Sequence, residues 1–121
     1  MYLTLTEPQA YKDVGNGVCQ IDGIDANGYG HWGWGDPTDH GDAQQVCDDD
    51  PKCMGFWKHS NERYQFFCSE ATTLCNAGSK GTITKPSDLK GSGTQGGGSC
   101  FIKPSSKSNH NEMYIIYTRI L

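Results

Sequence analysis

A short segment dense in aromatic residues is the part of the chain best suited to hold a ligand. Its candidates are Tyr29, His31, Trp32 and Trp34, with glycines among them, and Trp57 further along the chain is a fifth candidate. Exposed aromatic rings on a glycine-rich loop can stack on the C–H faces of sugar rings, while nearby polar side chains take the sugar hydroxyls. The alternative is that the tryptophans pack over a helix as additional core, and the sequence leaves both interpretations open.

Three consecutive carboxylates, Asp48, Asp49 and Asp50, are weak candidates for calcium ligands. They lie at the C-terminus of a predicted helix, where the helix dipole disfavours negative charge, and such a run invites a cation. The alternative is a solvated turn balanced by Lys52. We expect this alternative, and therefore neither a metal ion nor a cofactor.

Nucleophilic catalysis finds no support in the residue pattern. The chain has no Gly-x-Ser-x-Gly motif, and its four histidines are scattered along the sequence. A glycosidase-like pair of carboxylates stays open on residue types alone, but we expect no core large enough to host its pocket. We therefore expect a non-catalytic protein.

Six cysteines in 121 residues are the strongest compositional signal. A small domain with few apolar residues needs a supplement to its core, and disulfides are the usual one in secreted proteins. No Cys-x-x-Cys pair occurs, which disfavours a zinc site. We expect three disulfides and a secreted, extracellular protein, although the chain shows no signal peptide.

Charge and hydropathy exclude two classes of partner. The net charge is −4 with a pI near 5.4 and no basic cluster, which argues against nucleic-acid binding. No window approaches the roughly 18 apolar residues of a membrane span, so we expect no membrane insertion. The remaining partners are a glycan or an extracellular protein.

The charge is also unevenly distributed along the chain. Residues 1–50 carry ten acidic residues and one lysine, whereas residues 51–121 carry nine basic and four acidic residues. The two halves can attract each other within one fold, or they can favour self-association. Apolar strands predicted at 2–6 and 113–118 add to the second possibility, since an unpaired strand can extend a neighbour's sheet. The alternative function is thus a structural subunit of an extracellular assembly or filament.

The predicted elements indicate one small α+β domain spanning residues 1–121. A helix is expected from Asp42, acting as its N-cap, to a stop near Asp50 before Pro51, with Ala43, Val46 and Cys47 on its buried face. Strands are expected at 18–21, 53–59, 63–68 and 100–103, with a long loop at 22–41 and a flexible Gly/Ser-rich surface excursion at 76–99. One helix packed on a mostly antiparallel sheet is the natural arrangement.

The spacing around the predicted helix resembles the PAN/apple domain family. The residues that carry the resemblance are Ala43, Val46, Cys47, Pro51, Cys53, Gly55 and Phe56, with the segment 100–103 downstream. The resemblance implies a secreted, disulfide-rich recognition or adhesion module that binds proteins or carbohydrates, as a lectin does, without catalysis of its own.

The cysteine pairing follows in part from the predicted elements. A chain that reverses at the turn before Cys53 can bring Cys47 and Cys53 within disulfide range, and the resemblance implies the same bridge. Three arrangements then remain for the other four cysteines. Of these we favour Cys19–Cys100 together with Cys68–Cys75.

Overall fold

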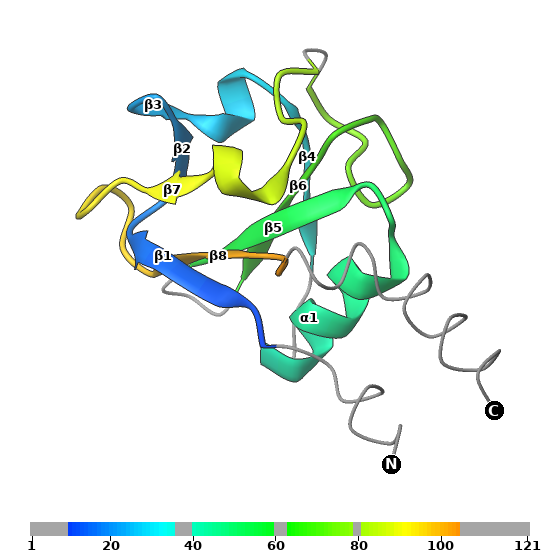
Figure 1. Ribbon diagram of the computed structural model, residues 1–121, viewed down its shortest axis with the longest axis horizontal. Coiled ribbons are helices and arrows are strands. Elements are labelled where there is room, and N and C mark those ends of the chain that lie inside the picture. The colour runs from blue at the N-terminus through cyan, green and yellow to red at the C-terminus, as the bar shows by residue number, and fades with distance from the viewer. Residues whose placement is uncertain (1–9, 36–39, 60–62, 79–80, 105–121) are drawn as a thin grey trace, which may run out of the picture.

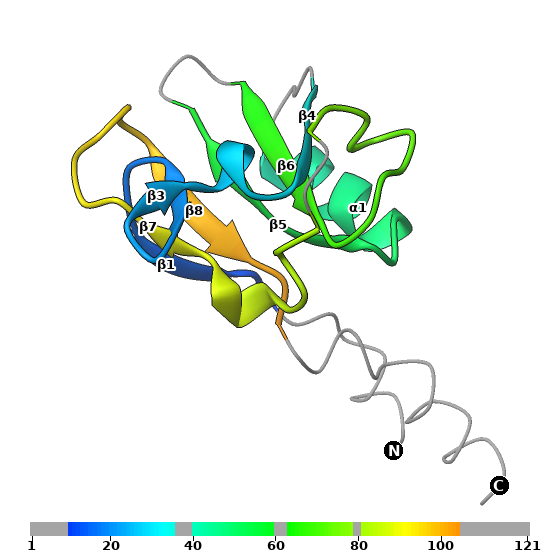
Figure 2. The same ribbon diagram turned by 90° about the horizontal axis from the view of Figure 1, so that it is seen from above.

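The computed structural model describes residues 10–35, 40–59, 63–78 and 81–104 of the 121-residue chain. These residues form two antiparallel sheets and one α-helix (Figures 1 and 2). The larger sheet has the strand order β1-β8-β5-β6-β4, and the smaller has the order β3-β2-β7. The fold is therefore a small disulfide-rich α+β domain, as the sequence predicts.

The larger sheet joins segments from both ends of the described chain. Its strands are β1 (Lys12–Asn16), β8 (Ser99–Ile102), β5 (Cys53–Lys58), β6 (Tyr64–Cys68) and β4 (His31–Gly35). Strands β5 and β6 are almost entirely buried because both faces of the sheet are covered. Alternation along each strand therefore divides the apolar side chains between two cores.

The helix α1 (His40–Asp49) covers one face of this sheet. Ala43 and Cys47 from the helix pack with Phe56, Tyr64 and Phe66 from the strands in one buried cluster. The helix ends where the sequence predicts, just before Pro51, but it begins at His40, so Asp42 lies within the helix and is not its N-cap. A second expectation was also wrong, because Val46 is 39% exposed. The positions of Ala43 and Cys47, one turn apart, set the buried face, and Val46 falls outside it.

The smaller sheet covers the opposite face. It consists of β2 (Cys19–Ile21), β3 (Ile24–Asp25) and β7 (Lys90–Gly91), with the short 3₁₀ helices η2 (Ala26–Gly28) and η3 (Pro86–Asp88) beside it. The second buried cluster includes Trp57 and Phe67 from the larger sheet and Ile83 and Leu89 from the segment that leads into β7. The larger sheet is thus the middle layer between the helix and the smaller sheet.

All three disulfides are those that the sequence analysis favoured. Cys47–Cys53 joins the end of α1 to the start of β5, with a Cα–Cα distance of 5.3 Å. Cys19–Cys100 ties the smaller sheet to β8 across 81 residues, and Cys68–Cys75 closes a short loop after β6. None of the cysteines is free, and all are completely buried.

The segment 22–41, expected as a loop, contains two strands. β3 pairs with β2 after a two-residue Asp22-Gly23 turn, and β4 is an edge strand paired along its whole length with β6. Glycines hid β4 in the sequence, because glycine is depleted from strands. Here the glycine at 33 is required, since a Cβ on Gly33 would lie 1.9 Å from the carbonyl oxygen of Leu74.

The segment 76–99, expected as a flexible surface excursion, is anchored to the rest of the domain at several points. Its two large apolar residues, Ile83 and Leu89, are 0% and 1% exposed, and its Gly-rich end is bonded to the start of β2. The N–H of Gly17 donates to the carbonyl of Gly98, and the N–H of Val18 donates to the carbonyl of Gln95. This segment therefore forms part of the second core. The terminal strands expected at 2–6 and 113–118 lie outside the described residues.

Candidate functional site: an aromatic surface over Gln65

The residues most suited to ligand contact gather where three neighbouring strands run side by side. Trp34 on β4 and Trp57 on β5 are both register partners of Gln65 on β6, the strand between them. Directly paired residues on adjacent strands project from the same face of a sheet. Trp34, Gln65 and Trp57 therefore form one row across the face that carries the smaller sheet.

The two indole rings converge above the middle strand. Adjacent strands lie about 4.7–4.9 Å apart, so β4 and β5 are separated by roughly 9.5 Å. The ring centroids of Trp34 and Trp57, however, are only 5.9 Å apart. The two rings therefore approach each other across the strand that carries Gln65.

Two further side chains complete what we call the Trp34 surface, which consists of Trp34, Trp57, His59 and Arg63. The His59 ring meets Trp57 edge to face at 4.6 Å and Trp34 at 6.2 Å. The Arg63 guanidinium lies 4.4 Å from the centroid of the Trp34 ring, in range of a cation–π interaction. Trp34 itself is 40% exposed, so part of a large, supported aromatic ring faces solvent.

Trp57 is the fixed part of this surface. Only 7% of it is exposed, and its indole N–H donates to the carbonyl of Gly97 at 2.9 Å. Gly96 lies against the same ring, where a Cβ would come within 2.9 Å. Residues 96–98 all have positive φ, the left-handed conformation that favours glycine. The glycine run thus holds one side of the Trp57 ring.

Gln65 is buried beneath the rings without a hydrogen bond for its side chain. It is 1% exposed, and neither its amide nitrogen nor its amide oxygen has a partner within the described part of the chain. Most buried polar groups in proteins are paired, because an unpaired one costs about 1–3 kcal/mol. A buried amide capable of both donating and accepting therefore lies directly under the exposed tryptophan.

The structure brings together only part of the predicted binding set. Trp34 and Trp57 are in contact, and Trp32 lies on the same face as Trp34 but packs partly buried against the second core. His31 is two residues from Gly33 and faces the helix side with its register partner Cys68. Tyr29 precedes the first residue of β4, at the end of the strand away from Trp34, and its carbonyl accepts a hydrogen bond from the N–H of Thr82.

Sequence analysis missed His59, Arg63 and Gln65. A signal was nevertheless present, because the predicted strands at 53–59 and 63–68 flank a short turn. Pairing Lys58 with Tyr64 in that hairpin places Trp57 opposite Gln65, which is the observed register. The contribution of β4, by contrast, depends on a strand that the sequence did not predict.

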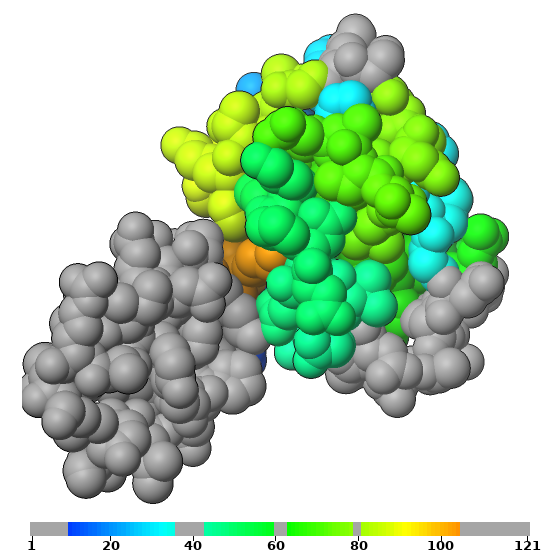
Figure 3. Space-filling view, turned by 90° about the vertical axis from the view of Figure 1, so that its right-hand side faces the viewer, coloured from blue at the N-terminus to red at the C-terminus, as the bar shows by residue number. Residues whose placement is uncertain are grey.

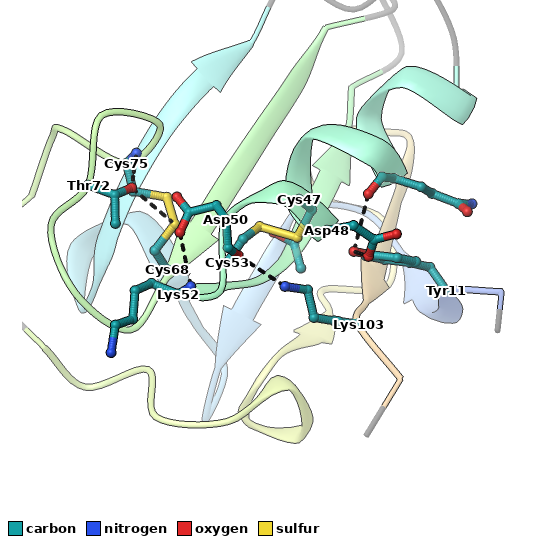
Figure 4. Close-up of a disulfide and its surroundings, with 12 residues drawn as sticks. Tyr11, Cys47, Asp48, Asp50, Lys52, Cys53, Cys68, Thr72, Cys75 and Lys103 are labelled. Atoms are coloured by element: carbon teal, nitrogen blue, oxygen red, sulfur yellow. Dashed lines mark hydrogen bonds between the residues drawn. A yellow bond between two sulfur atoms is a disulfide. The ribbon is translucent and has the colours of Figure 1, made fainter. Parts of the chain in front are cut away.

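The acidic residues at the end of α1 are held by separate partners (Figure 4). The Tyr11 hydroxyl donates to Asp48 at 2.6 Å, Gln45 donates to Asp49, and the backbone N–H of Lys52 donates to Asp50. No group of three or more His, Cys, Asp or Glu side chains suited to a metal ion occurs within residues that the structure describes. The three aspartates are thus not brought together as a ligand set.

A buried lysine compensates the negative end of the helix. Lys103 is 6% exposed, and its ammonium donates to the carbonyl of Asp50 at 3.1 Å (Figure 4). A cation at this position stabilises both the last carbonyls and the helix dipole. Burial, with the hydrogen bond to Asp48, raises the pKa of Tyr11 well above its ordinary value, so Tyr11 stays a hydrogen-bond donor. The acidic run therefore has a structural explanation.

The loop after β6 packs beside the helix end on the molecular surface (Figure 3). The N–H of Ser69 donates to the carbonyl of Lys52, and Lys52 pairs with Glu70 at 2.5 Å. Both side chains of this ion pair are substantially exposed, so it contributes little to stability. Among the residues that the structure describes, Trp34 is the exposed tryptophan, and it does not lie in this loop.

A hollow of about 500 Å³ lies on the smaller sheet, between residues 20–23 and the segment around Asp88 and Lys90. Burial opposes the charged form of Asp88, but hydrogen bonds from Thr84 and Lys85 hold the pKa of this carboxyl below its usual value. Asp88 therefore organises the start of η3. None of the described residues that line this hollow is aromatic.

No protein-family model, curated protein or solved structure matches the chain. Within the described residues, no helix has the length and apolar character needed to cross a membrane. Three disulfides in a domain this small are compatible with an extracellular location.

Proposed function

We propose that the chain is a secreted, non-catalytic recognition module of the PAN/apple type that binds carbohydrate through the Trp34 surface. The observation that carries the proposal is Trp34, a residue that is 40% exposed and whose ring contacts Trp57 and His59 at the edge of a buried sheet. A partly exposed indole is well suited to packing on the C–H face of a sugar. The three disulfides support a secreted module, and the Cys47–Cys53 bridge is the one that the PAN/apple resemblance implies.

A carbohydrate is favoured over a protein ligand because the surface is small and built around one ring. Stable protein interfaces usually bury about 800 Å² on each partner, with several aromatic or arginine anchors. The Trp34 surface offers one exposed tryptophan, flanked by Arg63. A protein ligand is the competing outcome of the binding test.

Binding to insoluble polysaccharides and to a glycan array tests this function. We expect the wild type to be retained by at least one polysaccharide and Trp34→Ala to bind at least tenfold more weakly. Val46→Ala is the matched control, because Val46 is equally exposed but lies on α1, across the sheet. The bound glycan should release no reducing ends. Retention of no carbohydrate, or equal retention of Trp34→Ala, contradicts the proposal.

A further inference from the structure

The Gln65 side chain is the feature of this surface that folding alone does not explain. It lies among buried aromatic residues, and both of its polar atoms lack a partner within the described chain. An apolar side chain of the same size would avoid the cost of burying an unpaired amide. Its position beneath Trp34 and Trp57 suggests that the amide is used when a ligand binds.

The two rings that cover Gln65 are held very differently. Trp57 is anchored by its hydrogen bond to Gly97 and by the contact with Gly96. Trp34 lies on an edge strand, and among described residues its side chain is held by ring contacts and by the Arg63 guanidinium alone. Trp34 is therefore the less firmly held of the two rings that share a face and a row with Gln65.

We propose that Gln65 binds two adjacent hydroxyl groups of a neutral sugar once Trp34 turns aside. This inference rests on the proposed carbohydrate-binding function and names the ligand group that the site recognises. A carboxamide accepts through its oxygen and donates through its nitrogen, and adjacent hydroxyls offer one donor and one acceptor at matching spacing. Because the amide is neutral and enclosed, an uncharged partner satisfies it without the cost of burying a charge.

Small methyl glycosides test the inference from the ligand side. Methyl glucoside, galactoside and mannoside, with their 2-deoxy and 3-deoxy counterparts, are titrated by NMR into the wild type, Gln65→Leu and Gln65→Asn. We expect one parent sugar to bind, and loss of one hydroxyl of the pair to weaken its binding to the wild type about tenfold. Gln65→Leu should bind the parent sugar at least tenfold more weakly and be insensitive to the same deoxygenation. Gln65→Asn, which keeps the amide but shortens its reach, should retain part of the affinity.

Gln45→Leu is the matched control, since Gln45 is an exposed glutamine on α1. It should leave sugar binding unchanged. Thermal unfolding of Gln65→Leu separates binding from structure, because loss of an unpaired amide should leave the unfolding midpoint unchanged or higher. A lower midpoint that accompanies weaker binding of parent and deoxy sugars alike overturns the inference and makes Gln65 structural.

Two further results overturn the inference while the proposed function stands. One is equal binding of the parent sugar to the wild type and Gln65→Leu. The other is retention on polysaccharide that depends on Trp34, with no binding of the methyl glycosides or no effect of deoxygenation. If the wild type binds no carbohydrate at all, the proposed function fails and the inference fails with it.

Discussion

The disulfides of this domain should differ in their contributions to stability, and the difference can be calculated from the loops they close. Cys19–Cys100 spans 81 residues and Cys47–Cys53 spans 6. On the chain-entropy model these loops correspond to about 4.5 and about 2.2 kcal/mol at 25 °C. All four cysteines are completely buried, so replacing either pair by alanine removes a similar amount of side-chain packing and lowers the free energy of unfolding by a similar additional amount. We therefore expect the long-range bridge to contribute about 2 kcal/mol more.

The assay is urea unfolding of two double variants, followed by tryptophan fluorescence. Cys19→Ala/Cys100→Ala should lose about 2 kcal/mol more free energy of unfolding than Cys47→Ala/Cys53→Ala. A protecting osmolyte, added equally to all samples, keeps the weaker variant folded at zero denaturant. Equal losses, or a larger loss for Cys47→Ala/Cys53→Ala, would refute the reasoning from loop length.

Four other substitutions test the packing described above. Gly98→Ala should cost at least about 3 kcal/mol, because its Cβ would overlap a backbone carbonyl oxygen at 1.8 Å in addition to the strain of a positive φ. Gly23→Ala is the control: Gly23 also has a positive φ but its Cβ would lie in open space, so the substitution should cost only about 1–2 kcal/mol in the same urea assay. Similar losses for Gly98→Ala and Gly23→Ala would show that the close contact at Gly98 adds nothing to the strain. Tyr11→Phe should lower the free energy of unfolding by about 1.5–3 kcal/mol at neutral pH, because it removes the hydrogen bond from the Tyr11 hydroxyl to Asp48. Because folding raises the Tyr11 pKa, the stabilisation from this group is fully present below pH 10, the ordinary pKa, and decreases above it. The free energy of unfolding of Tyr11→Phe should therefore depend less on pH above pH 10 than that of the wild type. Parallel plots of unfolding free energy against pH for the two proteins would contradict this explanation. Lys103→Met should lower the unfolding free energy by about 1–2 kcal/mol by removing the cation at the end of α1, and an unchanged midpoint would count against that role.

Local patterns were sufficient to predict much of the architecture. The stop of α1 follows from Pro51, and strands β5 and β6 follow from runs of apolar and aromatic residues around a polar turn. The bridge between Cys47 and Cys53 follows from the same reversal of the chain. These features depend on residues close together in sequence.

The missed features depend on contacts between distant segments. β4 contains Gly33 and Gly35 yet is a strand paired with β6. Both positions need glycine because the chain after β6 approaches Gly33, and the Phe66 ring approaches Gly35, too closely for any side chain. Ile83 and Leu89 become core residues although the chain around them has no regular period. Such packing leaves no periodic signal in a single sequence.

The Trp34 surface was predictable only in its aromatic part. Trp34 and Trp57 were identified by residue type, whereas the Gln65 position requires the register of both flanking strands. Burial on both faces also removes the polar–apolar alternation along β6. A glutamine in such a strand is recognisable as unusual only once both covering layers are known.

The central claim is that carbohydrate binds at Trp34, and an NMR titration of ¹⁵N-labelled protein tests it most directly. The titrant is a soluble oligosaccharide of whichever polysaccharide retains the wild type. We predict that the indole N–H resonance of Trp34 and the side-chain amide resonances of Gln65 move together and saturate, while the backbone amide of Val46 does not move. Saturating shifts centred on α1 or on the hollow beside Asp88, with the Trp34 indole unchanged, would contradict the account.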